Sequence, residues 1–84
     1  MANARIKYSL LNEISRSELE YFIEQYVRDE DDRYMVTRYY LDGIALQDIG
    51  EEMNPPMSRQ AVSRRVNRQY KILMRRIRNI KGTL

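Results

Sequence analysis

Apolar residues recur every three or four positions along much of this chain, which is the spacing of one buried side of an α-helix. The first clear stretch begins at Ser15 and Glu18, whose separation is typical of a capping box at a helix start. Its apolar positions are Leu19, Phe22, Ile23, Tyr26 and Val27. We expect an amphipathic helix here that ends near Arg28.

Two shorter helices are predicted in the middle of the chain, over residues 33–41 and 45–53. The acidic run 29–32 precedes the first, where carboxylates complement the positive end of a helix. A calcium-loop interpretation of this run is disfavoured, because alternating ligands and a central glycine are missing. Asp42-Gly43 should end the helix, since glycine accepts a left-handed backbone. The apolar stripe of the second helix contains Leu46, Ile49, Gly50 and Met53.

Gly50 is unusual because it lies inside a predicted helix, where glycine costs about 1 kcal/mol relative to alanine. Close approach of a crossing helix would explain its presence. Asn54-Pro55-Pro56 should then break the chain, since proline cannot continue a helix and restricts the residue before it.

The last predicted helix is the longest. Ser58 caps it, and residues 58–80 would form a rod of about 34 Å. Its apolar positions step by four and three residues, which is the pattern of a heptad seam: Val66, Tyr70, Leu73, Ile77 and Ile80.

The end of this seam needs a cover, because the rod is longer than three short helices can span. We expect its last three residues to join two copies in a homodimer: Leu73, Ile77 and Ile80. In the alternative, Leu10, Leu11 and Ile14 pack against the core and fold over the seam within one chain.

Together these elements predict an all-α, four-helix domain over residues 1–84. The chain has no Cys and no His, which removes disulfides, thiolate metal sites and the commonest general base. We therefore expect no enzymatic activity, no metal and no cofactor. The chain also lacks the apolar run of a signal peptide and any run of eighteen apolar residues. We expect a soluble, cytoplasmic protein with no membrane partner.

Charge divides the chain into two parts of opposite sign. Residues 1–52 hold all twelve acidic residues and six basic ones, whereas residues 53–84 hold nine basic residues and no acidic one. A solvated helix surface normally mixes both signs, because like charges repel. The positive part therefore indicates a polyanion as partner, and its seven arginines to two lysines suit phosphates and base edges.

A helix over 45–53, a short break and then a basic helix have the layout of a helix-turn-helix DNA reader, with its core at about residues 45–71. The first two turns of the basic helix present four residues suited to base edges in the major groove: Arg59, Gln60, Ser63 and Arg64. The residues expected to contact phosphates are Ser58, Asn67, Arg68 and Lys71. We therefore expect double-stranded DNA as the partner.

The stretch RYYLDGIALQDIGEEM at residues 38–53, followed by MSRQAVSRRV at 57–66, resembles region 4 of the sigma-70 family of transcription factors. The resemblance covers residues 34–71 and is similar to the form that small phage and mobile-element regulators use. It implies a transcriptional regulator and a contact with RNA polymerase. Pro55-Pro56 lengthens the turn relative to the family and affects the angle between its helices. Nothing corresponds to the promoter-melting part of a sigma factor, so we do not expect a complete one.

Other interpretations of the basic helix stay open. A DNA-packaging or recombination accessory protein would use the same helix without reading sequence. An interaction module would dock it on an acidic protein or on a membrane surface, and RNA is a further polyanion. Six of the seven tyrosines lie in the acidic part, which favours core packing over a stacking platform for single strands.

Overall fold

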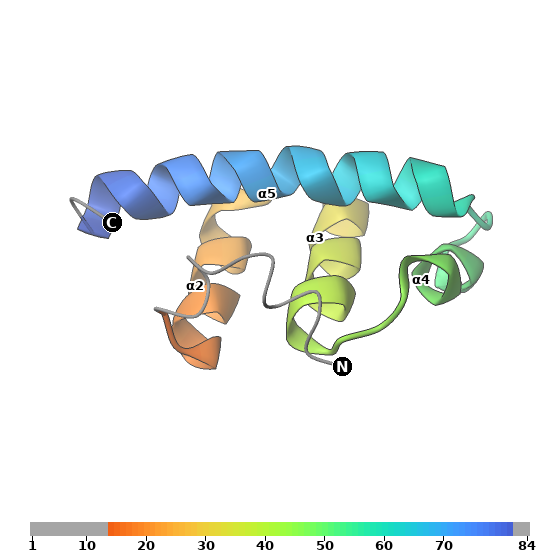
Figure 1. Ribbon diagram of the computed structural model, residues 1–84, viewed down its shortest axis with the longest axis horizontal. Helices are drawn as coiled ribbons and strands as arrows, with labels where there is room; N and C mark the ends of the chain where they lie inside the picture. The colour runs from red at the N-terminus through yellow and green to blue at the C-terminus, as the bar shows by residue number, and fades with distance from the viewer. Residues whose placement is uncertain (1–13, 82–84) are drawn as a thin grey trace.

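A computed structural model describes residues 14–81 of the chain, and the regular structure in that range is entirely helical (Figure 1). The elements in order are α2 (Arg16–Tyr26), α3 (Glu30–Val36), the π-helical turn η2 (Thr37–Leu41), α4 (Leu46–Glu52) and α5 (Arg59–Lys81). The predicted all-α class, with four α-helices, is confirmed. No helix within residues 14–81 is both long and apolar enough to cross a bilayer.

Helix α5 is a long rod, and α2, α3 and α4 all lie along one side of it (Figure 1). Each of these three helices packs against α5, so α5 is the element that unites the fold. The opposite side of α5 faces away from the other helices. This arrangement leaves one long side of the rod open.

The capping box that the sequence predicts at the start of α2 is present. The backbone N–H of Glu18 donates to Ser15 Oγ at 3.1 Å, and the Ser15 N–H donates to Glu18 Oε1 at 3.0 Å. Helix α2 ends at Tyr26, two residues earlier than expected, because Val27 adopts an extended backbone as its C-cap. Extended backbone here turns the chain toward α3.

Helix α3 begins at Glu30 rather than at residue 33, because Asp29 Oδ1 accepts the backbone N–H of Asp32 at 3.0 Å and caps it. Capping by the acidic run is thus confirmed. The helix then widens into η2, where the Asp42 N–H reaches the Thr37 carbonyl at 3.2 Å. Gly43 follows with φ +73°, so the predicted left-handed glycine ends this segment.

The core runs along the packed side of α5 and receives side chains from every other helix. Its buried residues are Leu19, Phe22, Ile23, Val27, Met35, Val36, Tyr40, Leu41, Ile49, Val62, Val66, Leu73, Met74 and Ile77. Ile14 packs against this cluster as a partly buried residue. Leu10 and Leu11, which the sequence places beside it, lie outside the described residues.

The predicted dimer seam is wrong for two of its three residues. Leu73 is 1% exposed and Ile77 is fully buried within a single chain, so neither side chain is available to a second copy. They are covered because α2 packs across the C-terminal half of α5, where a second copy was expected to provide the cover. Ile80 alone among the three is open, at 53% exposed.

The segment between α4 and α5 returns tightly to α4 in spite of its two prolines. The Met57 N–H donates to the Gly50 carbonyl at 2.9 Å. A Cβ atom at Gly50 would overlap the Met57 carbonyl oxygen and lie 3.4 Å from Val62 Cγ2. Gly50 is therefore required by close approach, as predicted, but the nearest neighbour is the backbone of the turn, with α5 second.

We expect Gly50→Ala to destabilise the protein by about 1–3 kcal/mol, since a main-chain neighbour cannot rotate away as a side chain can. This loss should appear although alanine is favoured over glycine by about 1 kcal/mol in a free helix. Urea unfolding followed by circular dichroism measures the change. Gln47→Ala, at an exposed position of the same helix, is the control and should stay within about 0.5 kcal/mol of the parent. If Gly50→Ala were as stable as the parent or more stable, the Met57 backbone would not be in tight contact with α4.

Candidate nucleic-acid interface

The open side of α5 is a continuous polar surface, which we call the outer face. Its residues are all exposed, and each lies three or four positions from another member of the set: Gln60, Arg64, Asn67, Arg68, Lys71, Arg75 and Arg78. Residues at this spacing lie on the same side of a helix. The outer face therefore extends along most of the rod rather than being confined to its first turns.

Cations dominate the outer face, and acidic side chains hardly reach it. Among the described residues, Arg64, Lys71, Arg75 and Arg78 make no ion pair. Arg68 has one distant partner, with Nη2 3.9 Å from Asp32 Oδ2, and its side chain is 65% exposed. These five charges are thus left to solvent or to an external anion.

The four predicted base-contacting residues do not all share this surface. Gln60 and Arg64 lie one turn apart on the outer face. Ser63 is half-buried at its edge, where its Oγ accepts Asn67 Nδ2 at 3.4 Å. Arg59 is exposed, but it precedes Val62 by three residues and so lies on the side of α5 that packs against α4.

Three of the four predicted phosphate-contacting residues lie together on the outer face: Asn67, Arg68 and Lys71. The fourth, Ser58, caps α5 by accepting the Ala61 N–H on its Oγ at 3.1 Å. Ser58 Oγ already accepts this hydrogen bond, whereas its hydroxyl proton can still be donated to a phosphate. Arg75 and Arg78 were not among the predicted contacts, although their spacing from Lys71 continues the same row.

Arg65 pairs with a buried carboxylate, and its own side chain is 30% exposed. Its Nε donates to Asp32 Oδ1 at 2.6 Å, and Gln69 Nε2 donates to the other carboxylate oxygen at 2.8 Å. Asp32 is only 3% exposed. This cluster joins α3 to α5. Arg65 is therefore directed toward α3, whereas Arg64 and Arg68 are exposed on the outer face.

Asp29 extends the same cluster at the start of α3. Its Oδ1 lies 3.4 Å from Arg65 Nη2. The backbone N–H of Asp32 is the main cause that lowers the pKa of Asp29, and the charges of Arg65 and Arg68 lower it further. The pairing of Asp32 with Arg65 could not be predicted from sequence spacing, because the two residues are 33 positions apart.

Arg76 is also directed away from the outer face. Its guanidinium carbon lies over the Tyr26 ring, 5.4 Å from the centroid, as in a cation–π contact with α2. Neighbouring cations on α5 therefore have different surroundings. Among the described residues Arg75 makes no ion pair, whereas Arg76 rests on an aromatic ring.

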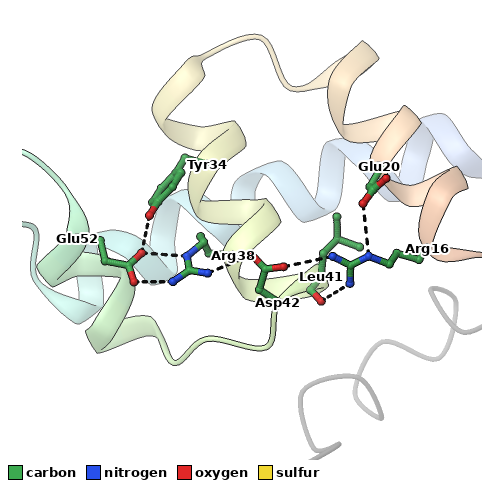
Figure 2. Close-up of polar contacts among 7 residues, drawn as sticks. All are labelled: Arg16, Glu20, Tyr34, Arg38, Leu41, Asp42 and Glu52. Carbon is green, nitrogen blue, oxygen red and sulfur yellow. Dashed lines mark hydrogen bonds and ion pairs between the residues drawn. The ribbon is translucent and has the colours of Figure 1, made fainter.

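A second polar cluster connects the other helices on the side away from the outer face (Figure 2). Arg38 binds Glu52 through two bonds, from Nε to Oε1 at 3.0 Å and from Nη2 to Oε2 at 2.7 Å. Tyr34 donates its hydroxyl to Glu52 Oε1 at 2.7 Å. Arg16 donates to the Leu41 carbonyl at 2.7 Å. The cluster thus ties α2 and α4 to η2.

The hydrogen bonds of this cluster shift the pKa values of Glu52 and Tyr34. Hydrogen bonds from Arg38 and then from Tyr34 lower the pKa of Glu52 from 4.5 to about 2. The same carboxylate raises the pKa of Tyr34. Glu52 therefore stays ionised. Both Glu52 and Asp42 form ion pairs with Arg38, so these acids do not offset the outer face.

Comparisons of the chain with known protein families, with curated proteins and with solved structures found no match. Within residues 14–81 no three acidic, histidine or cysteine side chains gather as a metal site.

Removal of the Asp32 carboxylate should destabilise the fold, because Arg65 would keep its charge with its buried partner gone. We expect Asp32→Ala to lower the free energy of unfolding by about 1–3 kcal/mol, because Arg65 and Gln69 both lose their acceptor. The matched control is Asp31→Ala, which removes an exposed acid from the same turn and should change stability by less than about 1 kcal/mol. Urea unfolding of both variants at pH 7 makes the comparison. Similar losses in the two variants would assign the effect to the helix start and not to Arg65.

Proposed function

We propose that the protein binds double-stranded DNA through the outer face of α5 and acts as a helix-turn-helix transcriptional regulator. The observation that carries this proposal is the row of cations on the outer face, which runs along the rod with no acidic residue on α5. Counterions released from phosphates would supply most of the binding free energy.

The shape of the molecule supports a duplex as the partner. An α-helix with its side chains is about 10–12 Å across, and the major groove of B-DNA is about 12 Å wide. Helices α2, α3 and α4 all lie behind α5, so within residues 14–81 no other helix stands between the outer face and a duplex (Figure 1). The first turns of α5 would enter the groove.

Gln60 and Arg64 are the residues that favour sequence reading over simple phosphate binding. Glutamine forms two bonds with the edge of adenine, and arginine forms two with the edge of guanine. Both side chains are exposed near the start of α5. A regulator needs such contacts, whereas an accessory protein for packaging or recombination needs the phosphate contacts alone. The resemblance to sigma-70 region 4 also favours regulation, and the polymerase contact that it implies stays a prediction.

Affinity for duplex DNA should fall steeply as salt rises. With roughly five to eight phosphates neutralised, a plot of log affinity against log salt would have a slope of about −4 to −7. Fluorescence anisotropy with a labelled 30-base-pair duplex measures it. A slope near zero, or no binding at low salt, would remove DNA as the partner and leave an acidic protein as the alternative.

Sequence preference and overall strength should depend on different residues of α5. Gln60→Ala and Arg64→Ala should each relax selectivity at one or two base pairs by about 1–3 kcal/mol. Lys71→Ala should weaken all sequences alike, because phosphates carry no sequence information. Selection from a random DNA library, followed by affinity measurements on the enriched and the random duplex, separates these effects. Flat enrichment with the parent protein would favour the accessory role.

A further inference from the structure

The C-terminal half of α5 carries a groove that the helix-turn-helix core at residues 45–71 does not account for. It has a volume of about 420 Å³ and is lined by Tyr70, Lys71, Met74, Arg75, Arg78 and Asn79. Three of these side chains are cationic. The almost fully buried Met74 forms the apolar bottom of the groove. The groove continues the outer face beyond the residues suited to base edges.

The position of this groove decides what part of a duplex it can meet. Arg78 lies fourteen residues after Arg64, which is about 21 Å further along the rod. The major groove winds around the duplex, whereas α5 is one uninterrupted helix. With the first turns of α5 among the bases, its far end must leave the groove and meet the sugar–phosphate backbone.

We propose that Arg75 and Arg78, together with Lys71, form a second contact with the backbone of the duplex, one that contributes affinity without reading sequence. This inference rests on the proposed DNA binding and extends the interface past the helix-turn-helix core. The cations bind successive phosphates.

The surroundings of Tyr70 favour a backbone contact over the stacking of an unpaired base. Its ring is half-buried and stacks on Tyr40, with the ring centroids 5.7 Å apart. A base needs an exposed aromatic face for stacking. Tyr70 therefore serves as a wall of the groove, and the exposed groups left to a ligand are the cations of Arg75 and Arg78.

Three single substitutions test the proposal, and each removes one positive charge from the same stretch of helix: Arg75→Gln, Arg78→Gln and Arg76→Gln. Arg76 is the matched control because its guanidinium lies over Tyr26 and not on the outer face. The probe is a labelled 30-base-pair duplex of random sequence, measured by anisotropy from 50 to 300 mM salt. Thermal melting shows that each variant is folded.

Arg75→Gln and Arg78→Gln should each weaken binding about fivefold to tenfold at 0.1 M salt and make the log–log slope shallower by about 0.9. Arg76→Gln should leave the slope unchanged and weaken binding less than twofold. If the parent binds and all three variants behave alike, the C-terminal half makes no directed contact and the inference fails alone. If the parent itself does not bind duplex DNA, the proposed function fails and the inference with it.

Discussion

The rotation of α5 about its own axis is the constraint on which the rest of the structure depends, since it decides which residues face outward. Two interactions fix it. Five apolar side chains of α5 are buried against the other helices, each worth about 1.5–3 kcal/mol: Val62, Val66, Leu73, Met74 and Ile77. The bond between Arg65 and the buried Asp32 holds the same rotation from the side of α3.

The two interactions contribute in different ways. Apolar burial supplies most of the stability. A buried ion pair gains little net free energy, because desolvation of its charges offsets their attraction, but an unpaired Asp32 would be costly. The pair therefore acts against wrong rotations of α5. It also ties Arg65 to α3, while Arg16 and Arg38 pair with acids on the far side of the fold (Figure 2). The result is a separation of charge in space that matches the separation along the chain.

Local signals in the sequence were sufficient to predict most of the helices. The capping box at Ser15, the left-handed Gly43 and the close approach at Gly50 each depend on a few neighbouring positions, and all three are confirmed. Long-range contacts were not predictable in the same way. Helical spacing shows that Leu73 and Ile77 share a side of α5, but it does not say whether α2 or a second copy covers them.

Prediction of the candidate site had the same limit: local patterns were informative, and long-range contacts were not. The charge asymmetry of the chain pointed to α5. Gln60 and Arg64, which were predicted together as base contacts, lie on one exposed side, whereas Arg59 of the same prediction lies on the side that packs against α4. The separate surroundings of Arg65 and Arg76 depend on Asp32 and Tyr26, which lie far away in the sequence. A count of charges alone therefore overstated how many cations an external partner could meet.

The central claim is that one side of one helix meets the duplex. Titration of ¹⁵N-labelled protein with a 16-base-pair duplex, followed by NMR, tests it most directly because every described helix reports at once. The account predicts that the largest shift changes follow the outer face from Gln60 to Arg78, with Tyr21 and the Arg38–Glu52 cluster almost unchanged. Changes centred on α2 or α4 with a silent outer face would contradict it.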